Sequence, residues 1–291
     1  MRLAYGRYFR PLRFFVLYVV ACALIFKVVE LCESWHNAHH FGVPFRVAQE
    51  FQQRNVDLSD VIGKKQEGHL SYRLRPPPMM AASQSIALVV FLHGAGERGD
   101  DNFQQLRTVP AELCDPSIVH EFPCAILVPQ CPKNFSWESG IVGGFTILNV
   151  LDRMCDEVLK DARIDSHRVY LVGYSMGGYG AWSWAANSPS RFAAIVPIAG
   201  GGDPRTGSVF IDLPVWAVHG AEDQIVSVEQ TRAIISAIRE AGGVPKYSEI
   251  AGLGHNSWRE LFGDDSAILR WLFSHKRERT VASSSKLQHA R

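Results

Sequence analysis

The sequence predicts an α/β fold built around a doubly wound, mostly parallel sheet. Short apolar runs alternate along the chain with longer segments of helical character, the order produced by parallel strands joined by crossover helices. Several of these runs are continuously apolar, as expected for strands covered on both faces. With 291 residues, of which 47% are hydrophobic and 20% charged, the chain can bury one large core. We therefore expect one principal domain with extensions at its ends.

Each expected element follows from its local pattern. The expected strands are 70–74, 86–92, 124–128, 169–172, 193–198, 215–218 and 246–250, of which only the first is a weak, alternating stretch. The expected helices are 147–162, 178–187 and 227–241, with a further short helix around 47–53. The segment between the strands at 193–198 and 215–218 is short and rich in Gly, Asp and Pro, so no large lid domain is expected.

Residues 1–31 are expected to form a membrane anchor or signal segment. Basic residues precede an almost uninterrupted apolar run at 14–26, which suits both interpretations. A spanning helix must tolerate Lys27 and Glu30 near one end, whereas the small residues typical of a cleavage site lie inside the run. We favour an uncleaved anchor with the remaining chain outside the cytoplasm, and keep a secreted or periplasmic cleaved form as the alternative. A lipoprotein box ending at Cys22 and an amphipathic start packed on a soluble protein remain weaker alternatives.

The other boundaries follow from composition. Residues 32–62 are mixed and polar and are expected to connect the N-terminal segment to a domain at 63–275. Residues 276–291 lack an apolar period and are expected to be a flexible basic tail. Three histidines of the connector are expected to form a solvated patch rather than a metal site. The net charge of +1 and the lack of a basic stripe exclude nucleic acid as an expected partner.

The residues after the expected strand at 169–172 carry the strongest chemical signal. They read Gly173-Tyr174-Ser175-Met176-Gly177, a GxSxG pattern between a strand and a helix. The small flanking residues let the backbone turn sharply enough to expose the serine hydroxyl, and the following helix start favours negative charge. Ser175 is therefore the candidate nucleophile, with a glycine-rich structural turn as the alternative.

A serine hydroxyl needs a base to accept its proton, and the base needs a third group to fix its tautomer. Two later strand ends supply such groups, Glu222 and Asp223 after one strand and His255 after the next. This is the chain order of acid and base that accompanies a GxSxG serine. We expect His255 as the base and Asp223 as the acid, because a new turn and helix start follow Asp223 directly. Asp203, after an earlier strand, is the rival acid.

The loop after the strand at 86–92 reads FLHGAGERGDDN and contains GxGxxG, a pattern that elsewhere marks a dinucleotide-binding turn. Two features oppose that interpretation. Asp100 and Asp101 follow the third glycine and would repel a pyrophosphate, and the strand at 124–128 ends without a carboxylate for the ribose. We therefore expect no NAD and no other cofactor. No metal is expected, because no CxxC motif or Cys/His ligand spacing argues for zinc.

The same glycines suit a close backbone approach to a bound oxyanion. We expect the N–H of Ala95 to be one donor, with Gly94 or Gly96 as alternatives, and the N–H of Met176 to be its partner. The charged residues within 97–101 are expected to form an internal cluster that holds this loop, with a solvated rim as the alternative.

Six segments together carry a family resemblance. They are LHGAGERGDDN, PQCP, GYSMGG, PVWAVHG, AEDQIV and GLGHNSW, and they occur in this order between about residues 70 and 273. The chain resembles the phospholipase/carboxylesterase-type α/β-hydrolases, in the branch often labelled predicted peptidase or carboxylesterase. The resemblance implies an α/β-hydrolase fold and a metal-free serine carboxylesterase that works through an acyl-enzyme. Its catalytic residues would be Ser175, Asp223 and His255, with the HGAG loop as oxyanion hole.

The substrate and two functional alternatives stay open. The family also resembles depolymerase-like and feruloyl-type esterases, so both small-molecule and polymer-linked esters are possible substrates. Gly94, Tyr174, Trp137 and Trp258 are the candidate pocket residues of an open site. A serine peptidase on the same residues is the first alternative, although no repeat is found that would build a peptide-positioning domain. A noncatalytic envelope-binding protein is the second. The oligomeric state is not predicted.

Overall fold

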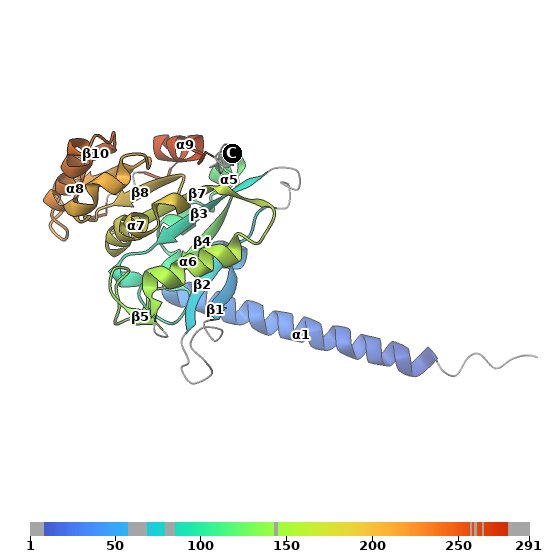
Figure 1. The fold of residues 1–291 in the computed structure, drawn as a ribbon. Coiled ribbons are helices and arrows are strands. Elements are labelled where there is room, and N and C mark those ends of the chain that lie inside the picture. Colours follow the sequence, from blue (N-terminus) through green and yellow to red (C-terminus); the bar gives the residue numbers. More distant parts are fainter. Residues whose placement is uncertain are drawn as a thin grey trace, which may run out of the picture.

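The chain folds around one eight-stranded sheet with helices on both faces (Figure 1). The structure is a computed structural model that describes residues 9–57, 69–78, 85–142, 145–256, 258, 261–263 and 265–278. The strands lie in the order β1-β2-β4-β3-β7-β8-β9-β10. The pairs β1/β2 and β2/β4 are antiparallel, and the remaining pairs are parallel. This confirms the expected doubly wound, mostly parallel sheet.

The strands of this sheet differ in length and burial. Their bounds are β1 Gln52–Asp57, β2 His69–Arg75, β3 Ile86–Leu92, β4 Cys124–Pro129, β7 Ile164–Tyr174, β8 Ala194–Ile198, β9 Trp216–Gly220 and β10 Lys246–Ile250. A separate two-stranded ribbon is formed by β5 Ile141–Val142 and β6 Phe145–Thr146. The central strand β3 is buried along its whole length, which is why its sequence is continuously apolar.

The helices form two layers over the sheet. Their bounds are α1 Phe9–Phe41, α2 Phe45–Glu50, α4 Val109–Glu112, α5 Pro116–Glu121, α6 Ile147–Val158, α7 Met176–Asn187, α8 Glu229–Glu240 and α9 Ala267–Ser274. Short 3-10 helices are η2 Ala95–Glu97, η3 Gln104–Leu106, η4 Pro189–Arg191 and η5 Pro204–Phe210. Only η5 lies between β8 and β9, in agreement with the expected lack of a large lid there.

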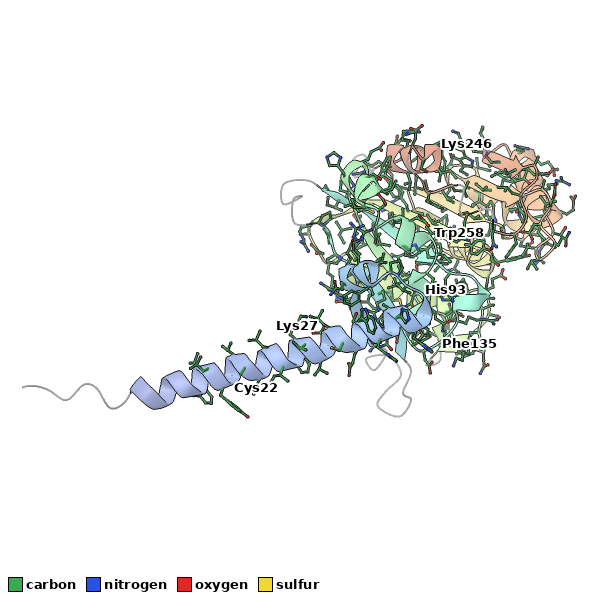
Figure 2. All side chains as sticks on the ribbon, turned by 180° about the vertical axis from the view of Figure 1, so that it is seen from behind. Cys22, Lys27, His93, Phe135, Lys246 and Trp258 are labelled. Atoms are coloured by element: carbon green, nitrogen blue, oxygen red, sulfur yellow. The ribbon has the colours of Figure 1, made fainter. Side chains whose placement is uncertain are left out.

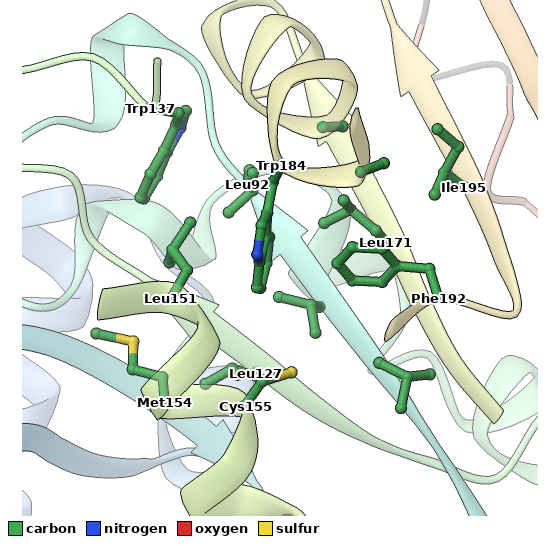
Figure 3. Packing of buried hydrophobic residues seen from close by; sticks show 14 of the residues in the cluster. Leu92, Leu127, Trp137, Leu151, Met154, Cys155, Leu171, Trp184, Phe192 and Ile195 are labelled. Carbon is green, nitrogen blue, oxygen red and sulfur yellow. The ribbon is translucent and has the colours of Figure 1, made fainter. Parts of the chain in front are cut away.

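Alternate residues of β3 point into two separate cores. Leu88, Val90 and Leu92 join the core beneath α6, α7 and α8, whereas Val89 and Phe91 join the core beneath α2, α5 and α9. Figure 3 shows the first core, in which Leu92 and other strand residues face the side chains of α6 and α7. Burying a large apolar side chain stabilises a fold by about 1.5–3 kcal/mol, so the two cores hold the strand ends in fixed positions.

The sheet begins earlier in the chain than the sequence predicts. The expected helix at 47–53 is instead α2 followed directly by β1, which pairs antiparallel with β2. The sequence of β1 is QQRNVD, and among its residues up to Val56 only Val56 is buried. A polar edge strand of this kind has no apolar period, so pattern alone could not reveal it. Part of the expected connector 32–62 therefore belongs to the sheet.

Helix α1 projects from the domain beside β1 (Figures 1 and 2). Among the described residues it is the one helix long and apolar enough to cross a membrane, over Phe15–Phe41. Its apolar side chains are uncovered, with Leu17 64% and Phe26 73% exposed. Its last turn is different, because Ala38 is buried and the ring of Phe41 stacks on Phe103 at 6.1 Å. The helix therefore runs from an uncovered apolar segment directly into contact with the domain.

A buried histidine holds the loop that follows β3. His93 is 0% exposed, and its Nε2 accepts a hydrogen bond of 2.9 Å from the N–H of Cys131. Its Nδ1 must then carry the proton, which it donates to the carbonyl of Gly94 at 2.6 Å. Burial lowers the pKa of His93 to about 4, against the raising effect of the Gly94 bond. The ring is therefore neutral at pH 7 and ties the end of β3 to the end of β4.

This environment predicts an acid-dependent loss of stability. The folded-state pKa of His93 lies below its ordinary value of 6.5, so below pH 6.5 the unfolded chain binds the extra proton. The free energy of unfolding should fall by up to about 3 kcal/mol through this group as the pH drops toward 4. Urea denaturation of wild type and His93→Gln at pH 7.5 and 4.5 measures it. The wild type should lose more stability than the variant, and equal losses would contradict the assignment.

Candidate active site

Ser175 stands at a strained turn between β7 and α7. Its φ of 56° and ψ of −118° place it on the left-handed side of conformational space, which costs a non-glycine residue about 1–3 kcal/mol. The turn is held by close packing, because a β-carbon on Gly177 would overlap the carbonyl oxygen of Leu92. The N–H of Ser175 donates to the carbonyl of Ile198 at 2.8 Å. The turn therefore lifts the serine hydroxyl above the sheet.

The structure brings together the three residues expected to carry catalysis. His255 Nε2 lies 2.8 Å from Ser175 Oγ, and His255 Nδ1 lies 2.7 Å from Asp223 Oδ2. A carboxylate only accepts hydrogen bonds, so Nδ1 carries the proton and Nε2 is free to accept the serine proton. The three side chains come from loops after β7, β9 and β10, and so meet at the carboxyl edge of the parallel strands.

The rival acids lie in other environments. Asp203 accepts from the N–H of Arg205 as the cap of η5, and it also forms an ion pair with the Arg205 guanidinium. Glu222 is exposed, and its neighbour Asp223 takes the place next to His255. The choice of Asp223 from the sequence thus matches the geometry, and Asp203 has a local structural role instead.

Asp223 is held as a carboxylate. Its side chain has no exposed surface, and Oδ1 accepts from the N–H groups of Ile225 at 2.8 Å and Val226 at 2.9 Å. Burial alone would raise the pKa of this carboxyl. The hydrogen bonds from His255 and from the two backbone N–H groups outweigh that effect, so the pKa of Asp223 is lowered from its usual value. The charge needed to orient His255 is therefore present at neutral pH.

A second buried histidine contacts the same carboxylate and was missed from the sequence. His219 is 0% exposed, and its Nε2 lies 3.2 Å from Asp223 Oδ2 and 3.0 Å from the carbonyl of Val226. Its Nδ1 lies 2.7 Å from Thr231 Oγ1, which donates to the carbonyl of Gly200. One sequence signal could have indicated this histidine. His219-Gly220 at the end of β9 repeats the pair His93-Gly94 that follows β3.

The expected oxyanion donors flank the serine. A β-carbon built on Gly94 would lie 3.5 Å from Ser175 Cβ, so the loop after β3 passes against the serine. Ala95 begins η2 and Met176 begins α7, and the first N–H groups of a helix have no acceptor within that helix. Neither N–H group therefore has an acceptor within its own helix.

The candidate pocket residues take different positions. Tyr174 is 7% exposed, donates from its hydroxyl to Asn256 Oδ1 at 3.0 Å, and places its ring 5.3 Å from that of His255. Trp258 is also nearly buried and packs edge-on against Tyr174. Trp137 does not line the pocket, contrary to the expectation from the sequence. It is 0% exposed, and its Nε1–H donates to the carbonyl of His93, so it supports the loop from beneath.

The charged residues at 97–101 brace the loop after β3. Glu97 Oε1 pairs with Arg107 at 3.0 Å, and the Glu97 carbonyl accepts from Gln130 Nε2 at 3.1 Å. Asp101 accepts from the same Gln130 amide at 3.0 Å, and hydrogen bonds lower the pKa of Asp101 despite its partial burial. Arg98 donates to the carbonyl of Ala95 at 3.1 Å. These contacts agree with the internal cluster expected from the sequence, except at Asp100, whose side chain is 92% exposed and lies 3.8 Å from Lys133 at the surface.

The chain is similar to known esterases over part of its length. Residues 70–209 match the family described as esterase PHB depolymerase. The chain is also similar to the crystal structure of a thermostable esterase, with 32% sequence identity and a TM-score of 0.70. That alignment covers 79% of this chain and 64% of the esterase chain.

Two curated proteins match over shorter or weaker alignments. The bifunctional acetylxylan esterase/xylanase XynS20E of Neocallimastix patriciarum is 24% identical over 163 residues, and an uncharacterized secreted protein of Arthroderma benhamiae is 25% identical over 229 residues. The alignments cover 56% and 65% of this chain, which spans only 23% and 24% of those proteins. The sheet topology and the match to the esterase structure show the α/β-hydrolase fold, and the chain is similar to esterases over the matched ranges.

Proposed function

We propose that the protein is a serine hydrolase that cleaves carboxylic esters through an acyl-enzyme. The observation that carries the proposal is the hydrogen-bonded chain from Ser175 through His255 to Asp223, with distances of 2.8 and 2.7 Å. Such a chain supplies a nucleophile, a base and a group that orients the base. The similarity to a thermostable esterase supports ester hydrolysis as the reaction.

The proposed reaction has two halves. In the first, Ser175 Oγ attacks the ester carbonyl carbon while His255 Nε2 takes the serine proton and then delivers it to the departing alcohol oxygen. In the second, His255 removes a proton from water, the water attacks the acyl-enzyme, and Ser175 regains its proton as the carboxylic acid leaves. Asp223 stays ionised throughout and stabilises the imidazolium that forms in each half.

The proposed oxyanion hole consists of the N–H groups of Ala95 and Met176. Each tetrahedral intermediate carries its negative charge on the former carbonyl oxygen, beside Ser175. Donors fixed in the backbone need no reorganisation when that charge develops, and losing one such donor typically costs about 3 to 4 kcal/mol of barrier. His93 holds this loop from within, because it binds the carbonyl of Gly94.

Polymer-linked esters are the substrate class that the site favours. Only the short helix η5 separates β8 from β9, so the described chain places no large lid over the serine at that point. An uncovered serine can reach an ester carried on a bulky chain, which an enclosed site would exclude. The matching acetylxylan esterase/xylanase is a protein named for such a polymer.

We further propose that α1 anchors the enzyme in a membrane, with the catalytic domain outside the cytoplasm. The uncovered apolar side chains of α1 between Phe15 and Leu31 carry this proposal. An exposed apolar helix surface of this length would be costly in water and is stabilised in lipid. Lys27 and Glu30 form an ion pair of 2.8 Å on the helix, which lowers the cost of carrying both charges near its membrane boundary. A secreted relative is consistent with export.

Replacing the nucleophile should abolish ester hydrolysis. Ser175→Ala should lower kcat on short acyl and aryl esters by about 10⁶-fold, because no other group can form the acyl-enzyme. A fluorophosphonate probe should label wild type at Ser175 and leave the variant unlabelled. Turnover that persists in the variant, or labelling at another residue, would overturn the proposal.

Matched ester and amide substrates separate an esterase from a peptidase. With the same acyl group, the ester should be cleaved at a rate that depends on Ser175, and the amide much more slowly. Faster amide cleavage would favour the peptidase alternative. A Ser175→Ala protein indistinguishable from wild type in every assay would favour a noncatalytic binding role.

Removing the carboxylate should disable the base. Asp223→Asn should lower kcat by about 10⁴-fold, because an amide no longer fixes the Nδ1–H tautomer of His255 or stabilises its charged form. Asp203→Asn is the matched control, since Asp203 caps η5 and pairs with Arg205. Steady-state kinetics of both variants on one ester tests the assignment, which fails if Asp203→Asn loses the activity and Asp223→Asn keeps it.

Deleting residues 1–31 should release the enzyme from membranes. The full chain should sediment with membranes and resist extraction at high pH, because the apolar side chains of α1 are in lipid. A control deletion of residues 279–291 should leave sedimentation unchanged. Recovery of the full chain in the soluble cytosol would refute the anchor, and a shortened, soluble extracellular form would support cleavage.

A further inference from the structure

Glu97 has one carboxylate oxygen without a partner beside the proposed nucleophile. The residue is 7% exposed, and Oε1 is occupied by the ion pair with Arg107. Within the described part of the chain no donor bonds to Oε2. Glu97 Oε2 is not among the buried side-chain atoms that lack a partner, so it keeps contact with solvent and can accept a hydrogen bond from a water or a ligand.

The free oxygen and Ser175 lie on the same side of Gly94. The point where a β-carbon on Gly94 would stand lies 3.2 Å from Glu97 Oε2, 3.5 Å from Ser175 Cβ and 3.5 Å from Tyr174 Cδ1. The carboxylate, the serine and a tyrosine ring therefore surround the same point beside Gly94. In the proposed acyl-enzyme the carbonyl carbon is bonded to Ser175 Oγ, so the neighbouring atoms of the substrate come within reach of Oε2.

The loop is also held by contacts other than this carboxylate. The backbone of Glu97 is fixed by its own contacts, since its carbonyl accepts from Gln130 Nε2 at 3.1 Å and its N–H reaches the carbonyl of Gly94. Gln130 is 1% exposed and also bonds Asp101, so this attachment is itself rigid. The side chain of Glu97 is therefore available for recognition as well as for its ion pair.

The local charge indicates which chemical group Oε2 recognises. Arg107 already balances the charge of Glu97, and the side chain of Arg98 follows it in the loop. A substrate ammonium would gain little from a carboxylate that is already paired, and a substrate carboxylate would be repelled by it. A neutral hydroxyl can donate to the free oxygen without adding charge, and a hydrogen bond to an ionised acceptor is a strong one.

We propose that Glu97 Oε2 accepts a hydrogen bond from a substrate hydroxyl close to the ester, and so selects hydroxylated esters such as those of sugars and hydroxy acids. This rests on the proposed ester hydrolysis at Ser175 and adds a specificity residue to it. The hydroxyl can belong to the acyl group or to the alcohol, because both lie next to the carbonyl carbon.

Two matched substrate pairs test the recognition. Ethyl glycolate and ethyl propionate differ by a hydroxyl in the acyl group, and 2-hydroxyethyl acetate and propyl acetate differ by one in the alcohol. For each pair, the ratio of kcat/KM is compared between wild type and Glu97→Gln. Intrinsic reactivity cancels in this comparison because the same esters are used throughout. Loss of the charged acceptor should lower the ratio by about tenfold or more in one pair, which also identifies the side of the ester that carries the hydroxyl.

Arg107→Gln and Gly94→Ala make the test specific. Arg107→Gln removes the brace on Oε1 but leaves Oε2 in place, so it should change both members of each pair by the same factor. Gly94→Ala keeps the carboxylate and puts a methyl group into the space before it, so it should lower the ratio as Glu97→Gln does. The rate of fluorophosphonate labelling at Ser175 reports whether each variant has an assembled site.

Opposite results overturn the inference. Unchanged ratios in Glu97→Gln and Gly94→Ala, with ester hydrolysis intact, would show that Glu97 only braces the loop. If the kcat/KM ratio fell equally in Arg107→Gln and Glu97→Gln, that result would also show that Glu97 only braces the loop. If wild type cleaves none of the four esters and equals Ser175→Ala, the proposed function itself fails, and the inference fails with it.

Discussion

The direct contact between the start of α7 and the end of β3 is the constraint on which the site depends. Gly177 packs against the carbonyl of Leu92 so closely that no side chain fits between them. Next to this contact the backbone of Ser175 has positive φ, which raises its hydroxyl above the sheet. The loop after β3 also passes against the serine. One packing contact therefore lies beside both the proposed nucleophile and the proposed oxyanion donors.

The site loops are held from beneath by two buried histidines. His93 ties the loop after β3 to the end of β4, and His219 ties the end of β9 to Asp223 in the loop that follows and to Thr231 of α8. Each side chain is 0% exposed and each is followed by a glycine that lets the chain turn at once. A rigid ring with two hydrogen-bonding atoms can fix two segments at a set spacing, which suits loops that must keep catalytic distances.

The sequence predicted the sheet and the serine, histidine and aspartate well because their signals are local. Fully buried strands read as apolar runs, and catalytic residues follow them at the carboxyl edge. The edge strand β1 was missed because it is polar and is defined by pairing with β2 rather than by its own pattern. Trp137 was misplaced for a similar reason, since its contact with His93 joins residues 44 positions apart. Long-range contacts of this kind leave no period in a single sequence.

The packing of Phe41 on Phe103 limits how the domain can move relative to α1. Val43 and Val47, just beyond the helix, are also buried, so no flexible tether separates α1 from the domain. A lipid-embedded α1 would act as a short, rigid support that keeps Ser175 at a nearly constant height above the bilayer. The enzyme would then search for esters by lateral diffusion in two dimensions. In an immobile polymer, it would hydrolyse only the esters that lie at this height above the bilayer.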